Sequence, residues 1–504
     1  MAIASAHRER ARTGVSRPPW KLAAGLAAGA ILAGLIAARL VVNGQEPGVL
    51  GLALVFLPVV LWKRPQLGPV VLLAGALSIE QFPYSVGRVQ GAFTDQIPLF
   101  HGLNDSARFK PADVLLVGLL AILVLKAPAS GIARIPRTPI ARAIYVLLGA
   151  VALGVLLGIS HHGDTRIAFT EIRPFVYLAT TFLLASSFLT TRAAFRPLLW
   201  TLVLASGFKA LQGVLIFAEV QGVRPRPEAV LGHEEAVFFG LFILLTLALW
   251  LFEIRGPLRT TATVLFPIVF VADLVNSRRT AWLILGAGFI ALAAIGYACL
   301  PRRRAFLRRL LAAVGVAAAI YVPTYWNSTG TIGQPARAIR SAVSPEGRDL
   351  MSNLYRVQEN ANLNLNIKQG GLLGKGWGVP IDYALPIDDI SSIDPLIAYI
   401  PHNGVLYIIM RLGVVGALAF WSLLAAGIIS ACRLARSRDA ELAVIGALIV
   451  CALVAYVMEG GSDLGFASYR IAFVIGTLLG VCDAALRLEA RSPTAAPCAG
   501  GMAR

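Results

Sequence analysis

Long apolar runs recur along the whole chain and are separated by shorter polar segments. A membrane-spanning helix needs roughly 20 mainly apolar residues, because the hydrocarbon core is about 30 Å thick and a helix rises about 1.5 Å per residue. On this criterion the sequence predicts about 14 spans, or about 12 if the short runs 48–62 and 67–79 are left out. The runs cover 22–42, 48–62, 67–79, 112–125, 143–159, 175–189, 198–220, 236–252, 261–275, 281–298, 310–325, 405–431, 441–458 and 471–485.

The composition agrees with this pattern. Of the 504 residues, 57% are hydrophobic and only 14% are charged, and the mean hydropathy is +0.72. Soluble domains are roughly 45–50% apolar and about 25% charged. A chain in lipid must satisfy its own backbone hydrogen bonds, so these runs are helices, whereas a barrel would show short alternating segments. The predicted fold class is an all-α polytopic integral membrane protein.

The basic residues indicate topology rather than nucleic-acid binding, although the formal net charge is +18. They occupy short loops at alternate ends of the runs, as expected when basic loops stay in the cytoplasm. The first run is interpreted as a retained span, with both termini inside. None of the five cysteines falls in a predicted exported loop. The expected parts are a cytoplasmic tail (1–19), the first part of the bundle (20–325), a partly helical extracytoplasmic loop (326–401), the last three helices (402–487) and a cytoplasmic tail (488–504).

Two basic sites break this charge rule. Arg224 with Arg226, and Arg278 with Arg279, lie in loops that the topology places outside. An anionic ligand at the outer surface would explain them. Lys209 lies inside an apolar run, where an ionisable side chain is a functional candidate by default.

One stretch carries a specific pattern. His402 and Asn403 precede an apolar run, and Gly413 and Gly416 follow after nine and two further residues. This spacing resembles the O-antigen ligase and O-antigen polymerase family. The segment 372–378, Leu-Leu-Gly-Lys-Gly-Trp-Gly, resembles the glycine element that precedes the histidine in that family.

Further motifs occur in the same order along the chain as in that family. Ser277-Arg278 resembles its Ser-Arg motif, and Arg226 matches the arginine of a stretch that ends in Asn-Pro-Asn. The chain departs from that stretch, because Ala229 replaces a glycine and 233–235 reads His-Glu-Glu. Arg356 lies where family members often carry an arginine. The resemblance covers roughly 220–420.

The resemblance implies a glycosyltransferase of the GT-C type in a bacterial plasma (inner) membrane. Its donor would be an undecaprenyl-pyrophosphate-linked glycan, and its acceptor a hydroxyl of a lipid, glycan or protein at the extracytoplasmic face. The expected catalytic residues are His402, Arg278 and Arg226. The expected substrate-binding residues are Asn403, Arg356, Arg279, Arg224 and Lys209.

The residue types suit this chemistry. Arginines hold phosphate oxygens by bidentate hydrogen bonds and stabilise a leaving pyrophosphate. A histidine, with an unperturbed pKa of roughly 6.5, can accept the proton of the acceptor hydroxyl near neutrality. Neither an Asp-x-Asp motif nor a Cys/His cluster with metal-ligand spacing occurs, so a metal-independent reaction without a cofactor is expected. A single displacement would invert the anomeric carbon.

Other interpretations stay open. Asn403 can serve as a helix N-cap, the two glycines are expected to permit close helix packing, and Glu171 and Arg173 to form a structural pair. A polymerase that extends repeat units with the same site is an alternative to a ligase. A transporter of lipid-linked sugars is another, but it predicts inverted repeats and charges deep in several spans, and no repeat is evident.

Overall fold

The computed structural model describes residues 57–81, 94, 97–101, 109–130, 136–223, 229–328, 330–391 and 395–491. All regular structure in these ranges is helical. The chain from Pro65 onward forms one compact unit, and the residues up to Arg64, of which 57–63 are helical, form another.

Ten helices in the described part of the chain are long and apolar enough to cross a membrane. Each coincides with one of the runs predicted from residue 143 onward, so the prediction of a polytopic membrane protein is confirmed. They are α6 (Pro139–Ser160), α7 (Thr165–Phe188), α8 (Phe195–Glu219), α9 (Glu234–Leu251), α10 (Pro257–Asn276), α11 (Arg279–Cys299), α12 (Arg304–Thr324), α15 (Gly404–Leu434), α16 (Ala440–Ser462) and α17 (Tyr469–Ala490).

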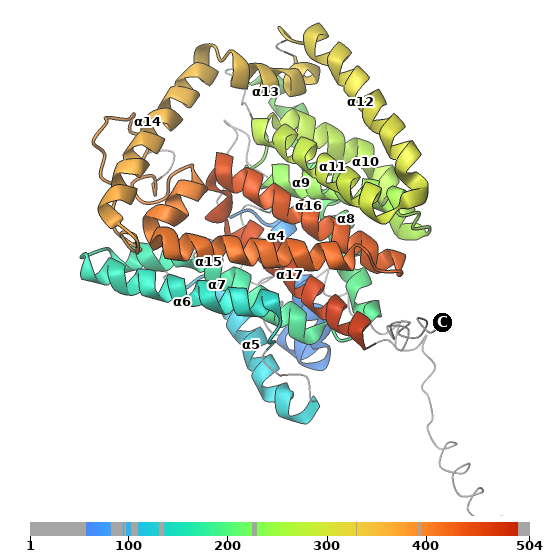
Figure 1. The fold of residues 1–504 in the computed structure, drawn as a ribbon, viewed down its shortest axis with the longest axis horizontal. Coiled ribbons are helices and arrows are strands. Elements are labelled where there is room, and N and C mark those ends of the chain that lie inside the picture. The colour runs from blue at the N-terminus through green and yellow to red at the C-terminus, as the bar shows by residue number, and fades with distance from the viewer. Residues whose placement is uncertain are drawn as a thin grey trace, which may run out of the picture. The chain divides into compact units, whose positions relative to one another are not determined.

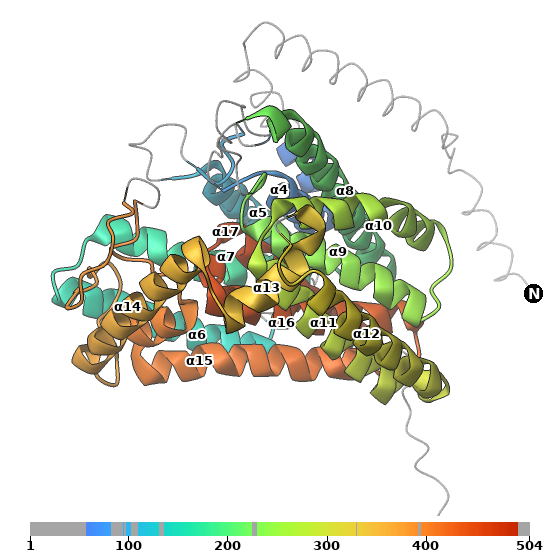
Figure 2. The ribbon, with the colours of Figure 1, turned by 90° about the horizontal axis from the view of Figure 1, so that it is seen from above.

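The remaining helices are shorter or more polar. The predicted run 67–79 forms α4 (Gly68–Ser78) and the run 112–125 forms α5 (Pro111–Ser130). The run 22–42 lies outside the described residues, as does most of 48–62. The long polar segment contains α13 (Gln334–Val343) and α14 (Gly347–Gly370). Figure 1 and Figure 2 show α12, α13 and α14 following one another along one side of the bundle.

Short polar side chains define where several helices begin. Thr138, Asp164, Asn403, Asp439 and Ser468 each accept a hydrogen bond from a backbone N–H in the first turn of the helix that follows. Such caps satisfy amide groups that have no partner inside the helix.

Small residues bring the central helices close together. The most extensive helix contact among the described elements joins α7 and α17. A Cβ on Gly476 would lie 2.1 Å from Thr181 Oγ1, so only glycine permits this approach. Helix α15 packs between α6 and α16, and α6 and α15 lie side by side in both ribbon views (Figure 1 and Figure 2).

Because successive long helices run in opposite directions, their connections gather at two ends of the bundle. At one end, Arg192 pairs with Asp439 at 2.6 Å and Arg196 with Glu441 at 2.7 Å. At the other end, which we call the site end, Asp164 N–H donates to the Gly378 carbonyl. The site end comprises the connections 161–164, 229–233, 276–279, 325–403 and 462–468.

Candidate active site

His402 lies at the site end, just before α15, and is held by α14. Its ring Nδ1 lies 3.1 Å from Glu359 Oε1, and its backbone N–H donates to the same carboxylate. The Tyr355 ring meets the imidazole edge to face, with centroids 5.7 Å apart. Since a carboxylate only accepts hydrogen bonds, this contact places a proton on Nδ1 and leaves Nε2 of the neutral ring as the proton acceptor.

The surroundings raise the pKa of His402. Burial lowers this pKa, but the hydrogen bond to Glu359 and the charges of Glu359 and Asp463 outweigh burial and the nearby Arg356. The imidazolium form is therefore stabilised by carboxylates on two sides. A histidine in this setting can accept a proton and hold the resulting charge.

Asn403 links α15 to α14. Its Oδ1 accepts from Leu406 N–H at 3.1 Å, as an N-cap, and its Nδ2 donates to Asn360 Oδ1 at 3.0 Å. Both ends of the amide therefore have protein partners. In the structure Asn403 positions the start of α15 beside His402.

A second histidine–carboxylate pair lies close to the first. His233 Nδ1 lies 2.6 Å from Asp463 Oδ2, and Asp463 Oδ1 accepts from Leu464 N–H at 2.8 Å. Burial raises the pKa of the Asp463 carboxyl, but His233 beside it, with Arg356 and His402 nearby, lowers that pKa below its usual range. Asp463 is therefore an ionised carboxylate in a buried position.

Arg356 connects the two pairs. Its guanidinium donates to the carbonyl of Ser462, the residue before Asp463. Glu359 follows Arg356 by three residues on α14, so both side chains lie on the same face of that helix. One turn of α14 thus contacts both His402 and the end of α16.

Arg278 occupies the sharp connection between α10 and α11. Ser277 adopts a left-handed conformation with φ of 55°, and Arg278 is extended before α11 begins. The Arg278 guanidinium donates to the Leu231 carbonyl at 3.3 Å, while its buried Nε has no hydrogen-bond partner among the described residues. Its charge acts on Glu459 of α16, which places Arg278 near the same cluster.

The other predicted cations have different outcomes. Arg279 lies 3.8 Å from Asp349 and donates to Ser352 and Asn353, so it fastens α11 to α14. Arg224 and Arg226 lie outside the described residues.

Lys209 is 1% exposed and is enclosed by partners rather than open to a substrate. Its ammonium contacts Glu80, lies 3.0 Å from Thr94 Oγ1 and 3.1 Å from Gln212 Oε1, and is 3.9 Å from Glu235. The intramembrane position therefore marks a buried ionic network, not an exposed ligand contact.

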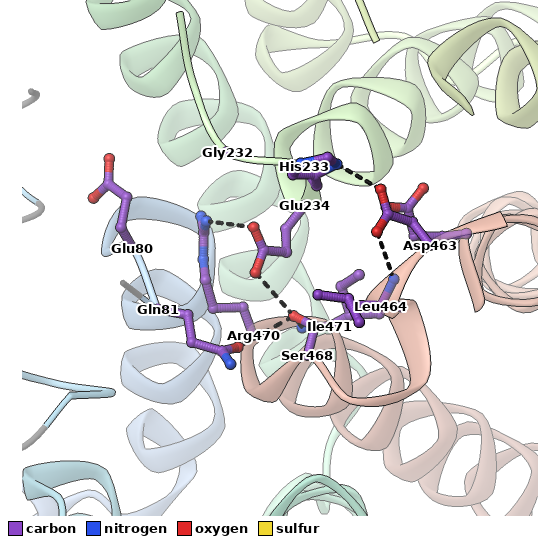
Figure 3. A pocket seen from close by; sticks show the side chains of 12 residues that line it. Glu80, Gln81, Gly232, His233, Glu234, Asp463, Leu464, Ser468, Arg470 and Ile471 are labelled. Atoms are coloured by element: carbon purple, nitrogen blue, oxygen red, sulfur yellow. Dashed lines mark hydrogen bonds and ion pairs between the residues drawn. The ribbon is translucent and has the colours of Figure 1, made fainter. Parts of the chain in front are cut away.

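A cavity of about 140 Å³ opens beside the second histidine–carboxylate pair. Figure 3 shows His233 in direct contact with Asp463 at the wall of the cavity, and Glu234 lying between Arg470 and Ser468. The lining residues are Glu80, Gln81, Gly232, His233, Glu234, Glu459, Asp463, Leu464, Gly465, Ser468, Arg470 and Ile471.

The glycine element fits against a break in α15. Gly413 has φ of 64° inside the helix, and a Cβ on it would lie 2.1 Å from the Leu372 carbonyl oxygen. Lys375 and Gly376 donate their N–H groups to the Met410 and Arg411 carbonyls. The prediction that Gly413 permits helix packing is therefore wrong, because its neighbour is the glycine element, which takes over backbone hydrogen bonds at the kink.

The expected pairing of Glu171 with Arg173 is also wrong. Glu171 lies 2.7 Å from Arg411, and Arg173 lies 3.5 Å from Asp113. Residues Glu171 and Arg173 are only two positions apart on α7, and side chains at that spacing do not face each other on a helix.

Several residues of the site were missed in the sequence. Glu359 had a usable signal, because it follows Arg356 by three residues in a loop that is expected to be partly helical. Glu459 and Asp463 had none, since only the packing of α16 against the other connections brings them to His233 and His402. His233 stood out in the sequence but had no visible partner.

The fold and site define a polytopic helical membrane protein with a histidine, arginines and carboxylates gathered at one end of its bundle. Residues 262–421 match the family model described as O-antigen ligase. This match supports an O-antigen ligase and polymerase family assignment and confirms the resemblance of the motifs between Ser277 and Gly416. No curated protein matches the chain. The matched region includes Arg278, Arg356, Glu359 and His402, whereas His233, Glu459 and Asp463 lie outside it.

This family indicates a glycosyltransferase-like enzyme with a ligase- or polymerase-like role in polysaccharide biosynthesis. It implies lipid-linked glycan substrates and contact with membrane lipids.

Proposed function

We propose that the chain transfers a glycan from an undecaprenyl-pyrophosphate donor to an acceptor hydroxyl at the extracytoplasmic face of a bacterial plasma membrane, as a ligase. The observation that carries this proposal is the His402–Glu359 contact inside the family-matched region. It provides an oriented proton acceptor next to cationic groups, which is the combination that glycosyl transfer to a hydroxyl requires.

In the proposed step, Nε2 of His402 takes the proton of the acceptor hydroxyl. The acceptor oxygen attacks the anomeric carbon, and the bond between that carbon and the phosphate oxygen breaks. The electron pair leaves with the lipid pyrophosphate, and the anomeric configuration inverts. Glu359 stabilises the imidazolium that forms, because its carboxylate faces Nδ1.

Arginines would hold the pyrophosphate without a metal ion. Arg278 has an unpartnered buried Nε, and Arg356 lies between His402 and Asp463. Arg226 is proposed as a third contact from the motif resemblance. Arg224 remains a proposed donor contact by position and Asn403 a contact for the sugar, whereas Arg279, which bonds to α14, is proposed to position that helix.

The proposed orientation rests on charge distribution. The end opposite the site end carries most of the basic loops, including Arg302–Arg309 and Arg433–Arg438. Cytoplasmic loops are enriched in Lys and Arg, so the site end would face outward.

A reconstituted reaction tests the proposal. Purified protein is mixed with an undecaprenyl-pyrophosphate glycan and a panel of acceptors: a lipid A core, an oligosaccharide and a protein. We expect a single transfer that falls about 10²–10⁴-fold in His402→Gln and also falls in Arg278→Gln. The matched control is His162→Asn, which alters an exposed histidine at the same end.

The products distinguish the alternatives. A ladder of lengthening glycan would assign polymerisation to the same site. Movement of the lipid-linked glycan across liposomes without transfer would overturn the enzyme proposal in favour of a transporter.

A further inference from the structure

The cavity beside His233 contains carboxylate oxygens that the protein leaves without a partner. Glu459 is 1% exposed and Glu80 is 4% exposed. Both line the cavity, and the Oε2 atom of each has no hydrogen-bond partner among the described residues. An unpartnered buried polar atom costs free energy unless a ligand or water satisfies it.

The chemistry of these atoms limits what the cavity can accept. A carboxylate oxygen accepts hydrogen bonds, and a protonated carboxyl group can also donate one. Glu234 and Asp463 add further carboxylates to the wall. His233 and Arg470 also line the cavity, but they are paired with Asp463 and Glu235. A neutral ligand with hydroxyl groups can donate to this lining and accept from it, whereas an anionic ligand would meet four acidic side chains.

The size of the cavity points to one ring. A cavity of about 140 Å³ is close to the roughly 150 Å³ that accommodates a benzene-sized molecule. The wall also offers Ser468, a hydroxyl that can donate or accept, and the apolar side chains of Leu464 and Ile471. Polar groups around a partly apolar space suit a sugar ring, which has hydroxyls at its edge and C–H groups on its faces.

The cavity adjoins the proposed base. Gly404, two residues after His402, packs so closely on α16 that a Cβ would lie 2.5 Å from the Gly460 carbonyl oxygen. Gly460 directly follows Glu459. Arg356 reaches the carbonyl of Ser462, next to Asp463, from the helix that holds His402. The backbone around His402 is thus in direct contact with the wall of the cavity.

We propose that this cavity is a subsite for one neutral sugar ring, whose hydroxyls donate to Glu459 and Glu80. The proposal rests on the proposed function, because it assumes that the chain handles glycans. It separates two tasks: the arginines hold the pyrophosphate, and the carboxylate-lined cavity holds a sugar ring. The ring belongs to either the donor or the acceptor glycan.

Direct binding of simple glycosides tests the subsite without any transfer reaction. Saturation-transfer NMR is recorded on the purified full-length protein in detergent with a neutral methyl glucoside, the methyl glucosamine glycoside and the methyl glucuronide. We expect the neutral glycoside to bind and the glucuronide to bind at least about tenfold more weakly. If only the glucosamine glycoside binds tightly, the ligand is an amino sugar, and the proposal of a neutral sugar ring is overturned.

The variant Glu459→Gln sharpens the test, because it replaces the carboxyl group by an amide of the same shape. We expect the neutral glycoside to weaken by about three- to tenfold, since one acceptor oxygen becomes an NH₂ group that only donates, and the glucuronide to gain affinity, since that NH₂ group can donate to its carboxylate. A merely structural role would weaken both glycosides alike. Glu346→Gln, an exposed glutamate before α14, is the matched control.

A second variant guards against misfolding of the first. Leu464→Trp places a large side chain in the cavity and should abolish glycoside binding. If the wild-type protein binds no glycoside, or both variants bind as it does, the subsite proposal falls and only water occupies the cavity.

The transfer assay and the glycoside-binding assay together test the two proposals independently of each other. Transfer without glycoside binding would leave the proposed function and remove the subsite. Glycoside binding that depends on Glu459, without transfer, would do the reverse. When transfer occurs, the substrate with which the glycoside competes identifies the source of the ring.

Discussion

Two of the buried ionic clusters at the site end differ in whether the protein satisfies both oxygens of their central glutamate. In the first, the Glu171 cluster, one carboxylate oxygen contacts Arg411 at 2.7 Å and Tyr407 at 3.1 Å, and the other accepts from Gly378 N–H at 2.6 Å. In the second, the Glu459 cluster of Glu459, Asp463 and His233, Glu459 Oε2 has no partner among the described residues.

This difference distinguishes a cluster that stabilises the fold from one that can bind a ligand. Arg411 also donates to the carbonyls of Gly376, Val379 and Tyr399, so the Glu171 cluster fastens the glycine element and the segment before His402 onto α15 and α7. Both oxygens of Glu171 are engaged by protein donors, whereas the Glu459 cluster leaves one carboxylate oxygen without a partner and lies beside a cavity. Buried charge alone therefore does not mark a site, and an unsatisfied carboxylate oxygen that also lines a cavity is the stronger signal.

The largest expected effect comes from breaking the Glu171 cluster. Arg411→Ala leaves Glu171 charged and unpaired in the interior, which typically costs about 3–5 kcal/mol. We expect a large loss of thermal stability, measured by fluorescence-detected size exclusion in detergent. Arg433→Ala, an exposed arginine on the same helix, should leave the melting temperature nearly unchanged. Equal melting temperatures for the two variants would contradict a supporting role for this cluster.

The next effect concerns the joint between the glycine element and α15. Gly413→Ala forces a Cβ into a left-handed residue and against the Leu372 carbonyl, at a cost of about 1–3 kcal/mol. We expect lower stability in the same melting assay. In Gly286→Ala the added Cβ meets nothing within 4 Å, so a change of small or opposite sign is expected there. A Gly413 variant as stable as wild type would show that the kink is not needed.

The third prediction concerns the proposed base, His402. In Glu359→Gln the contributions that raise the pKa of His402 are reduced, so this pKa falls. Since the neutral imidazole is the active form, the acidic limb of the kcat/KM profile should shift to lower pH. The plateau should fall by about tenfold as orientation weakens. Asp463 also raises the pKa of His402 and Arg356 lowers it, so Asp463→Asn should shift the limb in the same direction.

A pH series of the transfer reaction measures this shift, with Glu346→Gln as the control. An acidic limb that stays in place in Glu359→Gln would show that the limb does not report His402.

The sequence predicted the membrane fold well, because hydropathy and basic loops depend only on local composition. Each described helix from residue 143 onward that could cross a membrane matches a predicted run. The motifs also singled out His402 and Arg278, and the structure places both at the site end. Local patterns carry this information because a span or a motif is contained in one continuous segment.

The partners of those residues were harder to predict. Asp463 and Glu459 reach the site only through the packing of α16, and Arg411 is hidden inside an apolar run. Lys209 is the opposite case. Its position within a span predicted a functional role, but in the structure its ammonium group is paired with Glu80. Pairings between distant segments depend on helix order and contact, which hydropathy does not encode.

The smallest expected effect separates two adjacent arginines. Arg279 is tied to α14 by a half-exposed pair and two hydrogen bonds, so Arg279→Gln should cost at most about 1 kcal/mol. Its transfer rate should stay within about fivefold of wild type, because a loss of about 1 kcal/mol changes an equilibrium by less than tenfold. Arg278→Gln should reduce transfer much further, because the partly buried Arg278 has an unpartnered Nε and is the proposed contact of the leaving pyrophosphate. If Arg279→Gln loses transfer as fully as Arg278→Gln while its melting temperature is unchanged, Arg279 contacts the donor, and its bonds to α14 give way when the donor binds.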